Sequence, residues 1–268
     1  MKTSSALITV ILSLAIASCS AGGNRSVSSY EQLPDDDYRR LIAKAIMNDD
    51  PGMFASLCRY PIEREYPLHD IEDSAMMVKY FPTLVDDSLK RVISESTPDD
   101  WGEFGWRGSS LADGEYIWCD EGVIYSIPYQ SAQEKSMLDS LMRSYYAFMP
   151  SRYASGWKPE TCYTDSIGTV YRIDRKENGE EYLLTTIRQK DGAIDLSTAR
   201  SLPGTLEIQG SAATHVYSFS DNDSTIWMIM YFPYEEVTVL SREGDGQSDT
   251  SIPLTKAYWH DLIRNNPS

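Results

Sequence analysis

The chain has 268 residues, with 40 Asp and Glu against 24 Lys and Arg, and its formal net charge at pH 7 is −16. This charge argues against nucleic acid as a partner, because phosphate binding depends on a basic surface. The 18 Tyr, 6 Trp and 6 Phe supply enough apolar surface for a real core. The sequence therefore predicts a folded protein of one large domain or two modest ones.

The first residues have the pattern of a signal peptide. Lys2 precedes an apolar segment of about a dozen residues, which is shorter than the roughly 20 residues that a helix needs to cross a membrane. We therefore predict that residues 1–18 are cleaved rather than kept as a permanent span. The segment ends in Ile16-Ala17-Ser18-Cys19, which resembles the lipobox of bacterial lipoproteins.

The lipobox resemblance implies that the thiol of Cys19 carries a diacylglyceryl group and that Cys19 becomes the first residue of the mature chain. Two acyl chains suffice for stable attachment, since each buried methylene contributes about 0.8 kcal/mol. In that family, a serine such as Ser20 after the cysteine points to the outer membrane. Residues 19–29 are small and polar, which predicts a flexible tether. The alternative is a freely secreted protein in which Cys19 is incidental.

Residues 30–150 are predicted to form an α+β domain. Apolar residues recur at helical spacing in four segments, 33–46, 50–57, 70–81 and 86–94. Asp50 followed by Pro51 is an N-cap with proline at the first helical position. We predict that Asp70 caps the third helix and that Pro82 ends it.

The intervening and following segments predict strands and one long helix. Residues 59–68 contain two prolines and predict an edge-type strand. Alternation of polar and apolar residues predicts a hairpin at 115–127, with its turn at 120–122, and a preceding strand at 104–107. A capping box at 131–134 begins a long amphipathic helix, which belongs to the first domain or bridges the two.

Residues 151–268 are predicted to form a second, mainly antiparallel β domain, with the boundary at 151–159. Short strands recur at regular spacing, which indicates a sandwich or a barrel-like sheet. The predicted strands cover residues 169–174, 181–188, 205–209, 214–219, 225–231, 236–240 and 252–259.

Three cysteines remain when Cys19 is set aside. Cys58, Cys119 and Cys162 stand in apolar surroundings, which favours core packing over catalysis. An oxidising compartment permits one disulfide among the three, and the sequence does not decide whether one forms.

The order of helices, proline-marked strand, helices and hairpin resembles a known fold. Together with residues 54–61 (FASLCRYP) and 111–118 (LADGEYIW), it is similar to the cystatin-like cone of the nuclear transport factor two and ketosteroid isomerase superfamily, in a version found in uncharacterised bacterial envelope proteins. The resemblance covers residues 33–130 and implies helices against a curved sheet. Residues 171–174 and 206–211 resemble small β domains that follow such cones. The superfamily contains both enzymes and binding modules, so no activity follows.

No catalytic set can be assembled from the sequence. The histidines, His69, His215 and His260, are far apart, and the sequence contains no GxSxG, HExxH or Walker motif. If the cone has an open mouth, Asp113, Glu115 or Glu63 could act as a general base, as in the isomerases that the fold resembles. The alternative function is therefore a small-molecule enzyme.

One short segment concentrates groups that could bind a metal ion. His69, Asp70, Glu72 and Asp73 provide an imidazole and three carboxylates within five residues. The same residues suit the start of a helix, where acids accept from free N–H groups and complement the dipole. We favour the helix cap, so neither a metal nor another cofactor is predicted.

These observations predict a membrane-anchored lipoprotein of the bacterial cell envelope that acts as a noncatalytic binding module. Its partner would be an envelope protein, a glycan or a small ligand. Besides the enzyme, inhibition of a lytic enzyme is a second alternative.

Overall fold

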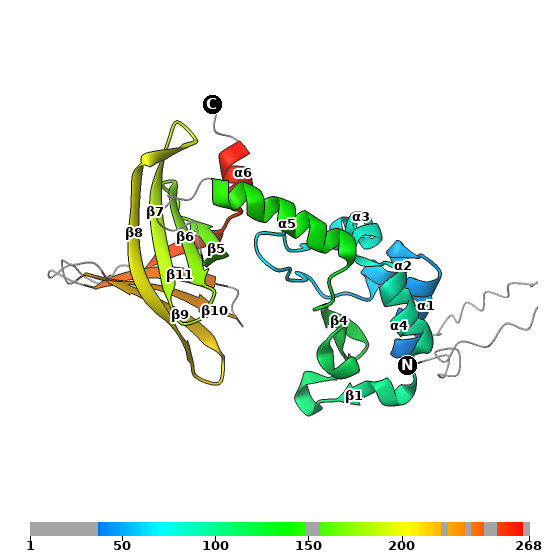
Figure 1. Ribbon diagram of the computed structural model, residues 1–268. Coiled ribbons are helices and arrows are strands. Elements are labelled where there is room, and N and C mark those ends of the chain that lie inside the picture. The colour runs from blue at the N-terminus through cyan, green and yellow to red at the C-terminus, as the bar shows by residue number, and fades with distance from the viewer. Residues whose placement is uncertain (1–36, 148–155, 221–224, 234–236, 244–250, 265–268) are drawn as a thin grey trace, which may run out of the picture.

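The computed structural model describes residues 37–147, 156–220, 225–233, 237–243 and 251–264. The predicted signal peptide, the tether and Cys19 lie outside the described residues, as does most of the predicted boundary at 151–159. The predicted α+β class with mainly antiparallel sheets is confirmed. Figure 1 shows a helical half and a β-barrel, with a long helix running between them.

Four helices form the first half, and an aspartate begins each of them. The helices are α1 (Tyr38–Met47), α2 (Pro51–Ser56), α3 (Ser74–Leu84) and α4 (Asp87–Glu95). The side chains of Asp37, Asp50, Asp73 and Asp86 each accept a backbone N–H from the first turn. Their apolar faces share a core that contains Ile42, Phe54, Phe81, Leu89 and Ile93.

The start and the end predicted for α3 were wrong. Asp73, not Asp70, is the N-cap, and its carboxylate accepts the N–H of Met76 at 2.7 Å. The helix also continues through Pro82 to Leu84. Pro82 comes so late in the helix that only Thr83 and Leu84, less than one turn, follow it.

A small antiparallel sheet completes the first half. Its strands pair in chain order and are β1 (Trp101–Glu103), β2 (Ser109–Leu111), β3 (Trp118–Asp120) and β4 (Val123–Ser126). Short 3₁₀ helices flank them at Pro98–Asp100, Gly105–Arg107 and Ala112–Gly114. The predicted hairpin is present, but its turn has two residues, Glu121 and Gly122, both with positive φ. The strand predicted at 104–107 is wrong, because those residues enter a 3₁₀ turn.

The cystatin-like cone is not what the structure shows. Strands of three or four residues cannot form the long curved sheet that would wrap a helix, and the large sheet of this protein is a closed eight-stranded barrel in the second half. The edge-type strand predicted at 59–68 is also absent. That segment is a loop with one isolated bridge, between Ile62 and Ile71.

The second half is a closed antiparallel barrel, one of the two sheet types predicted. Its strands are β5 (Trp157–Thr164), β6 (Thr169–Lys176), β7 (Tyr182–Lys190), β8 (Ala193–Gln209), β9 (Thr214–Ser220), β10 (Ile226–Phe232), β11 (Val237–Glu243) and β12 (Ile252–Lys256). Each pairs with the next, and β12 pairs with β5 to close the barrel. A second core, which includes Tyr171, Leu184, Phe219, Ile229 and Leu240, belongs to these strands.

Two helices connect the halves. Helix α5 (Ala132–Ala147) has 16 residues, which corresponds to about 24 Å, and it runs from the helical half to the barrel (Figure 1). Helix α6 (Trp259–Arg264) follows β12 and contacts α5. A third core joins α5, α6 and one face of the barrel, and it contains Tyr66, Tyr145, Cys162, Val170, Ile187, Ile194 and Trp259. Helix α5 therefore bridges the halves, which is one of the two roles predicted.

Candidate ligand-binding cleft

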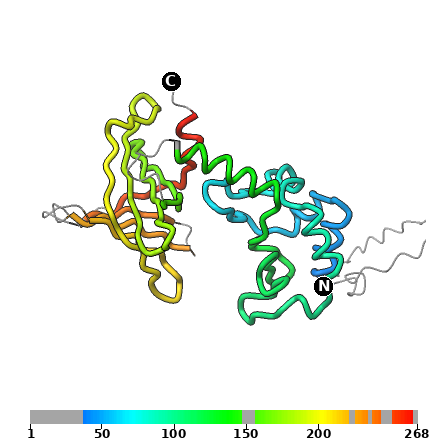
Figure 2. The backbone as a smooth tube through the Cα atoms, viewed as in Figure 1, coloured from blue at the N-terminus to red at the C-terminus, as the bar shows by residue number. Residues whose placement is uncertain are grey.

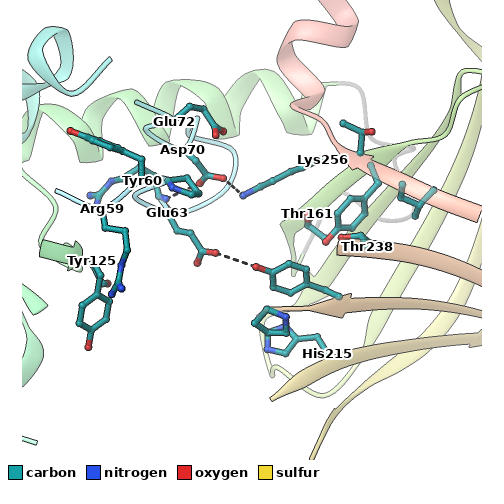
Figure 3. A pocket seen from close by; sticks show the side chains of 18 of the residues that line it. Arg59, Tyr60, Glu63, Asp70, Glu72, Tyr125, Thr161, His215, Thr238 and Lys256 are labelled. Atoms are coloured by element: carbon teal, nitrogen blue, oxygen red, sulfur yellow. Dashed lines mark hydrogen bonds and ion pairs between the residues drawn. The ribbon is translucent and has the colours of Figure 1, made fainter. Parts of the chain in front are cut away.

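A cleft of about 1060 Å³ lies between the two halves. Figure 3 shows its walls facing each other, with Arg59, Glu63 and Tyr125 on the helical half and Thr161, His215 and Thr238 on the barrel. The lining residues are Arg59, Tyr60, Pro61, Glu63, Arg64, Asp70, Glu72, Tyr125, Ser126, Thr161, Tyr163, His215, Tyr217, Tyr231, Pro233, Thr238, Leu254, Thr255 and Lys256.

The barrel wall of the cleft is the mouth of the barrel. Tyr163, Tyr217 and Leu254 line the cleft and also belong to the core cluster of the barrel strands. Thr161 and Thr238 are two positions from Tyr163 and Leu240, so they share their face of the strand. An eight-stranded barrel is wide enough to hold side chains or one small ligand. The cleft therefore continues the barrel interior toward the helical half.

The opposite wall carries charged and aromatic groups. The guanidinium of Arg59 lies 5.5 Å from the ring centroid of Tyr125, a cation–π arrangement. The exposed carboxylate of Glu63 reaches across the cleft, and its Oε1 lies 3.5 Å from the hydroxyl of Tyr231 on β10 (Figure 3). Both signs of charge and several aromatic faces thus meet in one concave surface.

The loop at residues 62–71 closes one end of the cleft. In Figure 2 this cyan segment extends from the helical half toward the barrel. The buried carboxylate of Asp70 forms an ion pair with Lys256 and accepts the N–H of Arg64 at 2.9 Å. The N–H of Asp70 donates to the Tyr258 hydroxyl at 2.9 Å, and the N–H of Trp259 donates to the Tyr66 hydroxyl at 3.1 Å. These bonds fix the loop to the segment that joins β12 and α6.

A buried ion pair fixes α5 to the helical half. Both guanidinium contacts of Arg64 with the Glu134 carboxylate are 2.6 Å long, and the two side chains are 2% and 0% exposed. Arg64 also donates to the carbonyls of Ile127 and Tyr129, and Tyr80 donates to Glu134 at 2.8 Å. Every charged atom of the pair therefore has a partner, as a buried pair requires.

A second buried ion pair fixes the other end of α5 to the barrel. The Nε of Arg172 on β6 donates to Asp174 at 3.1 Å, and the Tyr145 hydroxyl of α5 donates to the same carboxylate. The Arg172 guanidinium lies 4.7 Å and 4.9 Å from the ring centroids of Tyr145 and Trp259. Helix α5 is thus held at both ends, and the spacing of the cleft walls is built into the fold.

The tyrosines of the barrel mouth are neutral hydrogen-bonding groups. Burial raises the pKa of Tyr163 and of Tyr217 above the usual value, and nearby Glu160 raises that of Tyr217 further. The Tyr217 hydroxyl donates to Glu160 at 3.3 Å. These phenols are suited to binding a polar ligand rather than to accepting a proton.

The three described cysteines pack among hydrophobic side chains, which is the environment that the sequence favours for them. Cys58, Cys119 and Cys162 are free thiols. Burial raises the pKa of Cys58 and Cys162 to about 12 and that of Cys119 to about 11, so none is a thiolate at neutral pH.

The candidate general bases are not brought together. Glu63 lines the cleft, whereas Asp113 and Glu115 are exposed at the Ala112–Gly114 turn and do not line it. Sequence reasoning missed Arg59, Lys256 and the barrel tyrosines. No local motif marks these residues, because the cleft forms from segments up to about 200 positions apart.

The segment 69–73 serves two purposes rather than one. Asp73 caps α3, in agreement with the predicted cap, while His69 and Asp70 contact the second half. His69, His260 and Asp261 form a group of three possible metal-ligating side chains. Burial lowers the pKa of His260, and Asp261 opposes that change.

No family model, curated protein or solved structure matches this chain. Among the described residues, no helix is both long and apolar enough to span a membrane.

Proposed function

We propose that this protein is a lipid-anchored module of the bacterial cell envelope that binds a glycan without chemical conversion.

 Three observations support the proposal: the lipobox pattern that ends at Cys19, the acidic composition, and the cleft at the barrel mouth. The cleft is the observation that carries it.

The chemistry of the cleft favours a glycan among the partners that the sequence leaves open. Ligand sites combine apolar walls with a few convergent polar groups, and tyrosine offers both a flat face and a hydroxyl. Here Tyr125, Tyr217 and Tyr231 stand among Arg59, Glu63 and other charged groups. A polyhydroxyl ligand would stack on the rings and exchange hydrogen bonds with both signs of charge. The volume of about 1060 Å³ is large enough for several sugar units.

Binding in the cleft is tested with the full chain in detergent on an array of bacterial envelope oligosaccharides. Arg59→Ala is expected to weaken binding of the captured glycan at least about 10-fold, because a hydrogen bond from a charged donor contributes about 1.5–3 kcal/mol. Arg91→Ala, on the exposed face of α4, is the matched control and should leave affinity unchanged. Equal affinity of both variants, or no captured glycan, contradicts the proposed site.

The lipid anchor has a separate test. In cells that process lipoproteins, the wild-type chain is expected in the membrane fraction, and Cys19→Ala is expected to move to the soluble fraction, because the thiol that carries the acyl chains is gone. Ser20→Ala, which keeps the thiol, serves as the control for cleavage and export. Membrane association of Cys19→Ala equal to that of the wild type would remove the anchor from the proposal.

A further inference from the structure

Two segments 191 positions apart bring three ligand atoms to one point. The Nε2 atoms of His69 and His260 are 3.0 Å apart. The carboxylate of Asp261 turns one oxygen toward each ring, with Oδ2 at 2.9 Å from His69 and Oδ1 at 3.4 Å from His260. His69 comes from the loop of the helical half, whereas His260 and Asp261 belong to α6.

Hydrogen bonding alone does not account for this arrangement. A neutral imidazole nitrogen either donates or accepts, so the three contacts among the two Nε2 atoms and the carboxylate cannot all be hydrogen bonds at once. If both rings donate to Asp261, their two Nε2–H groups face each other at 3.0 Å. His260 is buried, and within the described part of the chain its Nδ1 has no hydrogen-bond partner. The polar contacts of its ring are therefore those with His69 and Asp261.

The spacing of the three atoms fits one face of a tetrahedral metal site. Zinc binds imidazole nitrogen and carboxylate oxygen at about 2.0–2.2 Å, which places neighbouring ligand atoms about 3.3 Å apart. The observed edges are 3.0, 2.9 and 3.4 Å. The Tyr258 ring lies against His69, with centroids 3.8 Å apart, and holds that ligand in orientation. The side chains of His69 and Asp261 are each 44% exposed, so an ion can enter from solvent.

We propose that His69, His260 and Asp261 bind one divalent zinc-type ion that fastens the loop of the helical half to α6. Two imidazoles and a carboxylate are ligands that Zn²⁺ accepts, and the fourth position is left to water. The ligand His69 directly precedes Asp70, whose carboxylate forms an ion pair with Lys256 in the cleft wall. Binding therefore stabilises the junction on which the cleft depends.

The test uses the full chain in detergent, stripped with a chelator and titrated with ZnCl₂ by calorimetry. One ion per chain is expected. His69→Ala and Asp261→Asn should each weaken binding by more than about 100-fold, since loss of even an outer-shell partner costs 10–100-fold. Asp99→Asn, an exposed aspartate of the Pro98–Asp100 turn, should bind as the wild type does.

Two further readouts separate a bridging ion from a surface ion. Zn²⁺ should raise the midpoint of thermal unfolding of the wild type but not that of His69→Ala, because only an ion held by both halves stabilises their junction. The visible spectrum of bound Co²⁺ should report tetrahedral coordination. His69 is partly exposed, so its variant is expected to fold, and circular dichroism checks this. An absence of binding, or equal affinity in His69→Ala, overturns the proposal, whatever the outcome for the glycan.

Discussion

Replacement of Glu134 by glutamine is expected to lower the free energy of unfolding by about 3–5 kcal/mol. Glutamine has nearly the same shape, so the packing of α5 is kept and the negative charge is lost. The guanidinium of Arg64, whose side chain is 2% exposed, then remains buried without its counter-ion. Urea denaturation followed by tryptophan fluorescence and by circular dichroism measures the loss.

Two variants show whether charge or packing causes the effect of Glu134→Gln. Asp139→Asn, an exposed site on the same helix, should change stability by no more than about 0.5 kcal/mol. The double variant Arg64→Met/Glu134→Leu removes both charges and should lose less than Glu134→Gln, because apolar replacement of a buried pair is often neutral. A double variant that is less stable than the single one would show that packing, not an unpaired charge, dominates.

Glu134 also shows how far local sequence rules reach. The predicted capping box is half right: the Ser131 hydroxyl accepts the N–H of Glu134 at 3.0 Å. The Glu134 side chain, however, turns to Arg64 rather than back to the helix start. The box rule describes an isolated helix end, and here a buried guanidinium 70 positions earlier competes for the carboxylate and prevails.

The helix starts were predictable where the cap depends on neighbours in sequence. Asp50 and Asp86 were placed correctly, since an N-cap needs only its own side chain and the N–H groups of the next turn. Asp70 was misplaced because Asp73, three residues later, serves the same purpose. Asp70 instead forms an ion pair with Lys256, a contact that no local pattern encodes.

The barrel strands likewise divide into those that the local sequence predicts and those that it does not. Strands with clear alternation, such as β6 and β9, were predicted near their observed bounds. β5 and the first half of β8 were missed, since β5 carries Pro159 and polar residues and β8 is interrupted by Pro203 and Gly204. Both are held by neighbours on either side of a closed sheet, which compensates for weak local preference.

The cleft was beyond prediction for a related reason. Its position depends on α5 as a spacer fixed at both ends, by Arg64 with Glu134 and by the group around Arg172. Neither pair is visible as a sequence motif. Arg64 and Glu134 are 70 positions apart, and Arg172 contacts Tyr145 and Trp259, which lie on separate helices. The charged residues that position the site are therefore the ones whose pairing requires the fold.

Replacement of Arg172 by leucine is expected to lower the free energy of unfolding by about 3–5 kcal/mol at pH 8. The Asp174 carboxylate is 0% exposed and would keep only the hydroxyl of Tyr145 as a partner. Leucine also loses the contacts of the guanidinium with the rings of Tyr145 and Trp259. Arg175→Leu on the same strand is the matched control, because its side chain is 40% exposed and exposed ion pairs contribute about 0–1 kcal/mol.

The pH dependence of Arg172→Leu identifies the cause of its loss. Burial already raises the pKa of Asp174, and the Arg172 guanidinium opposes that rise. Without Arg172 the folded-state pKa of Asp174 increases further above its unfolded value, so the folded state holds a proton that the unfolded state releases. Stability relative to the wild type should then fall as pH rises through this window, and the loss should be smaller at pH 4.5 than at pH 8. Urea midpoints at the two pH values measure it. An equal loss at both pH values would assign the effect to the lost ring contacts, because an uncharged leucine makes no cation–π contact with Tyr145 and Trp259 at any pH.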